Sequence, residues 1–204
     1  MIMIRFFKRN SLWIIICLCS LYSFYYLDKK STTYLSTVYI PYCQLLSWFI
    51  SPGAQLLLWS FMYISTRLKR HSVNFLCAEV LITQIICIGL ARIVKNLVGR
   101  SRPELLVSKN IYGFYGFDTS TFYHSFPSGH TLSVFVLASA LSVQFPHLKY
   151  LFFLLAILFS LTRVFLLKHF LSDILVSATV GILIHKFIHN YFKEIHYETI
   201  RTQN

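Results

Sequence analysis

The longest uncharged stretch of the sequence runs from Ser31 to Thr66, 36 residues without Lys, Arg, Asp or Glu. A helix needs about 20 apolar residues to cross the hydrocarbon core of a bilayer, so this stretch is too long for a single span. Pro41, Pro52 and Gly53 interrupt it. We therefore expect its first part to lie along the membrane interface and a transmembrane helix to end at Thr66.

Five further stretches have the length and apolar composition of transmembrane helices. Hydrophobic residues make up 56% of the 204 residues and charged residues only 13%, about half the ~25% of a typical soluble protein. We expect an all-α, polytopic membrane bundle of about six transmembrane helices, in a single integral membrane domain over residues 1–204. The five further spans are Ser11–Leu27, Ser72–Val98, Ser128–Pro146, Leu148–Leu167 and His169–Tyr191.

The chain carries 19 Lys and Arg against 7 Asp and Glu, a formal net charge of +12. In a soluble protein this excess indicates nucleic acid binding, but in a membrane protein it indicates cytoplasmic anchors or an anion site. An amino terminus in the cytoplasm satisfies the positive-inside rule. We interpret His185 and His189 as further cytoplasmic anchors, and expect Glu79 to pair inside the bundle. The ten basic residues placed in the cytoplasm are Arg5, Lys8, Arg9, Arg67, Lys69, Arg70, Lys149, Lys186, Lys193 and Arg201.

Two cations at the end of the third span suit an anion with several oxygens. Lys95 and Arg102 are seven residues apart, so two helical turns bring them to one face, and Arg92 lies on the same stripe. Pro103 has no N–H group and discourages further helix. Such a pair can hold a phosphate, although basic residues that snorkel to the interface produce the same pattern.

A helix start signal lies just before the fourth span, in Pro127-Ser128-Gly129-His130. Ser128 is a plausible N-cap, and the free N–H groups and dipole of a helix amino terminus attract anions. Gly129 allows a phosphate to approach the backbone closely, and His130 projects at the mouth. The alternative is an ordinary capped helix with an interfacial histidine.

A histidine and an aspartate lie near the junction of the fifth and sixth spans. His169 and Asp173 are four residues apart, so on a helix their side chains meet. A carboxylate can fix the tautomer and orientation of an imidazole that acts as nucleophile or base, and Arg163 supplies a third cation nearby. The alternative is a buried hydrogen bond that only ties helices together. All three segments fall on the non-cytoplasmic side of the predicted topology, so they can converge on one site.

These segments resemble the three signature motifs of the type 2 phosphatidic acid phosphatase superfamily, which includes lipid phosphate phosphatases. Their order and internal spacing match, and they span residues 95–173. One departure is Thr162, where the family often has Ser, and it keeps the hydroxyl group. The motifs are Lys95-x6-Arg102-Pro103, Pro127-Ser128-Gly129-His130 and Arg163-x5-His169-x3-Asp173.

The resemblance implies a role for each motif residue. His169 would attack phosphorus and form a phosphohistidine, Asp173 would orient His169, and His130 would protonate the leaving lipid oxygen. Water would then hydrolyse the phosphoenzyme. No metal or other cofactor is implied, because fixed cations supply the electrostatic stabilisation. The groups expected to hold the phosphoryl oxygens are Lys95, Arg102, Ser128, Gly129 and Arg163.

The aromatic loop over residues 111–126 separates the first two motifs. We expect it to form a partly buried lid or a contact surface for a lipid headgroup. Within it, Tyr123 and His124 are interpreted as interfacial aromatic residues, which are common at membrane surfaces.

The predicted function is hydrolysis of a lipid phosphate or pyrophosphate, at a site facing the periplasm or exterior from a bacterial inner membrane. The resemblance suggests a polyprenyl pyrophosphate, phosphatidylglycerol phosphate or lipid A 1-phosphate as substrate. The expected partners are this lipid and the membrane, and not nucleic acid, while the sequence does not indicate an oligomeric state. Two alternatives use the same residues: a lipid-to-lipid phosphotransferase, and a non-enzymatic anion-binding or transport protein.

Overall fold

The computed structural model describes residues 14–38, 40–68 and 74–203, and these ranges contain helices and no strands. Residues 14–22 form an α-helix that continues into the π-helix η1 (Ser23–Leu27). Arg5, Lys8, Arg9, Lys69 and Arg70, predicted as cytoplasmic anchors, lie outside the described residues. The following helices are α2 (Asp28–Leu35), α3 (Tyr42–Phe49), α4 (Pro52–Leu68), α5 (Asn74–Val98), α6 (Pro103–Lys109), η2 (Thr121–Tyr123), α7 (Gly129–Gln144), η3 (Pro146–Leu148), α8 (Lys149–Phe165) and α9 (Leu171–Gln203).

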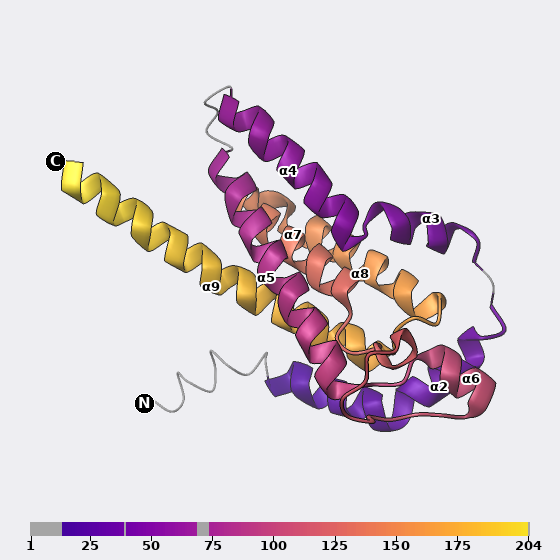
Figure 1. The fold of residues 1–204 in the computed structure, drawn as a ribbon. Helices are drawn as coiled ribbons and strands as arrows, with labels where there is room; N and C mark the ends of the chain where they lie inside the picture. The colour runs from indigo at the N-terminus through magenta and orange to yellow at the C-terminus, as the bar shows by residue number, and fades with distance from the viewer. Residues whose placement is uncertain (1–13, 39, 69–73, 204) are drawn as a thin grey trace.

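Helix α7 forms the centre of the bundle and packs against α5, α8 and α9 (Figure 1). Its side chains are apolar or small on all faces, which is typical of a helix surrounded by others. Val136 on α7 is fully buried against Cys87 and Ala91 of α5. Gly181 of α9 sits against the α7 backbone, where an added Cβ would lie 2.8 Å from the carbonyl oxygen of Leu132. These small residues allow the helices of the core to approach closely.

Within the described residues, three helical segments are long and apolar enough to cross a membrane: Phe75–Val98, Pro146–Phe165 and Leu171–Glu194. Helices α3 and α4 together count as a fourth if the 40° bend between them lies within one span. The bend falls at Pro52, as the sequence predicts, because proline favours the first position of a new helix. Helix α7 is apolar but shorter. The all-α membrane bundle is confirmed, while the count of six spans stays a prediction.

The segment between α5 and α7 folds over one end of the bundle and includes α6 and η2 (Figure 1). Arg100 forms isolated backbone bridges with Phe114 and with His124, which tie the loop together. Gly99 begins it with a φ of +53°, and a Cβ there would lie 1.9 Å from the carbonyl oxygen of Gly116. Only glycine fits this turn, so the loop is closely held to the end of α5.

At the opposite end of the bundle, the predicted pairing of Glu79 is confirmed. Its carboxylate lies between His185 and His189 of α9, 2.8 Å from the first and 2.9 Å from the second. His185 is fully buried. The interpretation of His185 as a cytoplasmic anchor is therefore wrong, because its ring faces the inside of the bundle rather than the interface.

Candidate active site

The predicted site residues lie at helix ends that meet at one end of the bundle. Lys95 is in the last turn of α5, Arg102 is the N-cap of α6, and His130 is in the first turn of α7. Arg163 is in the last turn of α8, and His169 lies in the turn between α8 and α9, outside both spans. Four different helix ends thus supply cations and imidazoles to a common region.

The charges of three predicted site residues act on His169. Burial lowers the pKa of His169 well below its usual value, and the nearby charges of Lys95, Arg163 and Arg102 lower it further. His169 is therefore neutral at physiological pH. A neutral imidazole surrounded by fixed cations is suited to attack an anionic group that those cations hold.

The orientation of His169 comes from the backbone. Its Nδ1 lies 2.5 Å from the carbonyl oxygen of Ser125. Because a carbonyl only accepts hydrogen bonds, Nδ1 carries the proton and Nε2 keeps its lone pair. Leu167 has a φ of +53°, and the N–H groups of Lys168 and His169 both donate to the carbonyl of Arg163. This left-handed turn ends α8 and positions His169.

Asp173 lies beside His169 but does not bond it directly. The Oδ2 atom is 3.9 Å from His169 Nδ1, and it accepts instead from the Ser125 hydroxyl at 2.6 Å and the Phe170 N–H at 2.9 Å. The two side chains meet, as the spacing predicts. However, the expected direct hydrogen bond is replaced by a link through Ser125, whose carbonyl holds the imidazole.

Arg100 forms the base of this arrangement and was not singled out by the sequence. It is 1% exposed and makes ion pairs with both Asp173 and Asp28. The Asp28 carboxylate also accepts from the Ser172 hydroxyl at 2.5 Å. Burial opposes the charged form of Arg100, but Asp173 and Asp28 outweigh it and raise the pKa of the guanidinium. The network joins α2 to the amino terminus of α9.

Ser128 caps α7 as the sequence predicts. Its buried hydroxyl accepts from the N–H of Thr131 at 3.4 Å, and its own N–H donates to the Ser177 hydroxyl at 2.8 Å. The Ser128 N–H therefore already has an acceptor within the protein and is not left for a phosphate. By helix geometry, the N–H groups of Gly129 and His130 in the first turn remain for an anion.

The three predicted cations differ in the hydrogen bonds that they make within the protein. Lys95 donates from Nζ to the carbonyl of His124 at 3.0 Å. The Nε atoms of Arg102 and Arg163 are buried and have no acceptor among the described residues. Buried donors without partners are rare in native proteins, and an anion that binds between these two guanidinium groups would satisfy both.

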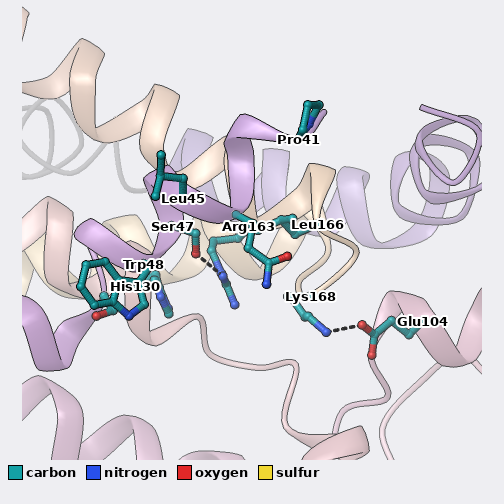
Figure 2. Close-up of a pocket in the computed structure, with 11 residues that line it drawn as sticks. Pro41, Leu45, Ser47, Trp48, Glu104, His130, Arg163, Leu166 and Lys168 are labelled. Atoms are coloured by element: carbon teal, nitrogen blue, oxygen red, sulfur yellow. Dashed lines mark hydrogen bonds and ion pairs between the residues drawn. The ribbon is translucent and has the colours of Figure 1, made fainter. Parts of the chain in front are cut away.

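A cavity of about 830 Å³ opens beside these groups. His130 and Arg163 line it, and Arg163 donates to the hydroxyl of Ser47 on α3 (Figure 2). Across the rim, Lys168 pairs with Glu104 (Figure 2). Another wall of the cavity is apolar. It consists of side chains from α3 and from the residue before it, including Pro41, Leu45 and Trp48. Lys95, Arg102 and His169 are not among the lining residues, and His169 is 2% exposed.

A sequence model of the PAP2 superfamily matches residues 72–197, well over half of the chain. The chain belongs to the PAP2 superfamily. The matched range contains all three predicted motifs and the helix ends that carry them. It also contains Arg100 and Ser125, but not Asp28.

Two lipid A 1-phosphatases from Rhizobium species are similar to this PAP2 protein in sequence. The relative from Rhizobium johnstonii is 29% identical over 109 residues, 53% of this chain and 45% of that protein. The relative from Rhizobium etli is 31% identical over 102 residues, 50% of this chain and 44% of that protein. The chain thus spans less than half the length of these curated relatives.

Two crystal structures share the fold of this PAP2 protein. LpxE of Aquifex aeolicus has a TM-score of 0.56 at 23% identity, covering 81% of this chain and 96% of its own. The PAP2-type phosphatidylglycerolphosphate phosphatase of Bacillus subtilis has a TM-score of 0.59 at 17% identity, covering 93% and 98%. At these identities the likeness concerns the helical membrane fold, which the sequence correctly predicts.

The sequence missed the residues that support the motifs. Ser125, Asp28 and Arg100 are polar groups at the ends of apolar runs, where they resemble ordinary interfacial residues. His124 was interpreted as interfacial but is 3% exposed. The sequence held one signal for Asp28. The chain has only 7 acidic residues, and an ionised aspartate at the end of a transmembrane helix needs a partner of opposite charge.

Proposed function

We propose that this PAP2 protein hydrolyses the phosphate group of a membrane lipid through a phosphohistidine at His169. The observation that carries the proposal is the setting of His169: a neutral imidazole, held at Nδ1 by the Ser125 carbonyl, among three fixed cations. This setting combines an oriented nucleophile with charges that stabilise the phosphoryl group in the transition state.

In the first step, Nε2 of His169 attacks phosphorus and the bond from phosphorus to the lipid oxygen breaks. His130 donates a proton to that oxygen, so the lipid leaves as an alcohol. Lys95, Arg102 and Arg163, with the N–H groups of Gly129 and His130, hold the phosphoryl oxygens. In the second step, water attacks the phosphohistidine, His130 accepts its proton, and inorganic phosphate leaves with His169 neutral again. Asp173 holds Ser125 and thereby orients His169.

The cavity supports an amphiphilic substrate. His130 and Arg163 provide a polar floor for a phosphate, while Leu45 and Trp48 provide an apolar wall. Trp48 is 67% exposed, which suits contact with a lipid chain. The two curated relatives favour the 1-phosphate of lipid A over a polyprenyl pyrophosphate or phosphatidylglycerol phosphate. The predicted cytoplasmic amino terminus supports a site that faces the periplasm or exterior from a bacterial inner membrane.

The test uses the purified protein in detergent and a panel of these three lipid phosphates. Release of inorganic phosphate is measured for the wild type, His169→Ala and the matched control His147→Ala, whose histidine is exposed and belongs to none of the motifs. We expect release from lipid A 1-phosphate, abolished only by His169→Ala. If His169→Ala released phosphate at the wild-type rate, the assignment of His169 as the nucleophile would be refuted. If labelled phosphate were transferred to a second lipid and no free phosphate appeared, hydrolysis would be refuted.

A further inference from the structure

A second cluster of chemically active side chains lies at the other end of the bundle. Glu79 on α5 lies against His185 and His189 on α9. Glu79 and Lys95 are 16 residues apart on α5, which corresponds to about 24 Å along a helix. The cluster is therefore separate from the phosphate site, and the proposed phosphatase mechanism does not use it.

The three side chains bring their donor atoms close together. The Glu79 Oε1 atom is 2.8 Å from His185 Nε2 and 2.9 Å from His189 Nδ1, and the three donor atoms lie within 4.8 Å of one another. The two histidines are one turn apart on the same face of α9, and their rings are 5.9 Å apart and nearly parallel. Two histidines at this spacing on a helix commonly hold a metal ion together.

His185 shows that the cluster is more than an ordinary hydrogen-bonded ion pair. The residue is fully buried, and its Nδ1 lies 2.7 Å from the hydroxyl of Ser139 on α7. Its Nε2 is close to Glu79 but has no hydrogen-bond partner among the described residues, because the ring does not aim at the carboxylate oxygen. A buried imidazole nitrogen that lies next to a carboxylate and makes no hydrogen bond can serve as a metal ligand.

The chemistry of the donors selects the class of ion. Two imidazole nitrogens and one carboxylate oxygen form the ligand set of zinc sites that keep a fourth position open. A cavity of about 250 Å³ lies beside Glu79 and His189 and includes Gln144 in its lining, so a water molecule can complete the coordination. Ser139 would hold the second nitrogen of His185, as outer partners of metal ligands do.

Binding requires a small adjustment. Ligands at about 2.1 Å from a tetrahedral ion are about 3.4 Å apart, so each imidazole nitrogen must move away from the Glu79 oxygen by roughly half an ångström. The His189 side chain is 31% exposed and can move outward by this amount, while His185 is fixed by burial. We propose that Glu79, His185 and His189 form a binding site for a divalent first-row metal ion of the zinc class, which ties α5 to α9.

The test measures Zn²⁺ binding to the full chain, purified with a tag that contains no histidine. Elemental analysis gives the stoichiometry, and calorimetric titration with Zn²⁺ alone gives the affinity. We expect one ion per chain, an affinity at least tenfold weaker in Glu79→Gln and His189→Asn, and about tenfold to a hundredfold weaker in Ser139→Ala. Co²⁺ in place of Zn²⁺ should give the visible absorption of a tetrahedral site.

Two controls separate this site from other histidines. His147→Asn changes an exposed histidine, and His169→Ala removes the proposed nucleophile, and both should bind Zn²⁺ as the wild type does. His189→Asn and Ser139→Ala alter one partner each and keep the test valid if Glu79→Gln does not fold. Equal Zn²⁺ affinity in wild type, His189→Asn and Ser139→Ala, or no Zn²⁺ binding by the wild type, would overturn the proposal. The phosphatase assay is a separate readout, so failure of one proposal does not affect the other.

Discussion

The imidazole of His169 is held at Nδ1 by the carbonyl oxygen of Ser125, 2.5 Å away. The Ser125 hydroxyl in turn donates to Asp173 at 2.6 Å. The carboxylate therefore acts on the imidazole through the residue that carries the carbonyl. This relationship makes Ser125 a positioning residue, and it can be tested without changing either charged group.

Ser125→Ala removes the hydroxyl link but keeps the carbonyl. We expect kcat to fall about tenfold to a hundredfold, since hydrogen bonds to charged groups contribute roughly 1.5–3 kcal/mol, with KM nearly unchanged because substrate contacts remain. Steady-state phosphate release measures both constants. Ser36→Ala, which changes an exposed hydroxyl bonded within its own turn, is the control. A wild-type kcat for Ser125→Ala would show that the hydroxyl does not position His169.

Arg100→Met leaves Asp28 and Asp173 buried without their cation. Removing one partner of a buried ion pair costs about 3–5 kcal/mol, so we expect the unfolding free energy to fall by that amount and activity to be lost. Lys168→Met breaks the pair with Glu104, in which both side chains are 36% exposed, and should cost less than about 1 kcal/mol. Chemical unfolding in detergent compares the two variants. Equal losses would contradict the structural role of Arg100.

The low pKa of His169 predicts a pH-dependent stability. An unfolded chain protonates this histidine near pH 6.5, whereas burial and the nearby cations keep it neutral in the folded protein. The unfolded state then binds more protons below pH 6.5, so the unfolding free energy falls as pH decreases, by at most about 1.4 kcal/mol per pH unit.

Unfolding measured between pH 7 and pH 5.5 tests this linkage. We expect a steeper loss for the wild type than for His169→Gln, and no such difference between the wild type and His147→Gln, which changes an exposed histidine. Equal slopes in all three proteins would mean that the pKa of His169 is not lowered in the folded protein.

Two glycines in the helices give opposite expectations for the same substitution. At Gly181 an added Cβ lies 2.8 Å from the Leu132 carbonyl oxygen, whereas at Gly89 nothing lies within 4 Å. Gly181→Ala should lower the free energy of unfolding by about 1–3 kcal/mol through overpacking. Gly89→Ala should leave the free energy of unfolding unchanged or raise it by about 0.5–1 kcal/mol. Thermal unfolding of both variants measures the difference. A Gly181→Ala variant that unfolds at the same temperature as the wild type would refute the close packing of α7 and α9.

Local sequence patterns predicted the helices and the motif residues, because apolar runs and short spacings act over one or two turns. The relation of His169 to Asp173 was predicted less well. The spacing assumed one continuous helix, but α9 begins at Leu171, so Asp173 lies in its first turn and accepts the N–H of Phe170. That capping bond competes with the imidazole for the carboxylate.

Contacts between distant segments could not be predicted from spacing. Arg100 and Asp28 are 72 residues apart, and each alone looks like an interfacial charge. His185 resembled an anchor because it lies toward the end of the last span, yet it faces α7 and α5. Such pairings depend on how the helices rotate against one another, which follows from packing around α7 rather than from any local pattern.

The most direct test of the account is covalent trapping of phosphate on the protein. The protein is mixed with a lipid phosphate labelled at phosphorus and quenched in alkali within the first turnover, and the labelled residue is mapped by mass spectrometry. We expect phosphate on His169 in the wild type and none in His169→Ala. Labelled phosphate bound covalently to His169→Ala, or on another residue of the wild type, would contradict it.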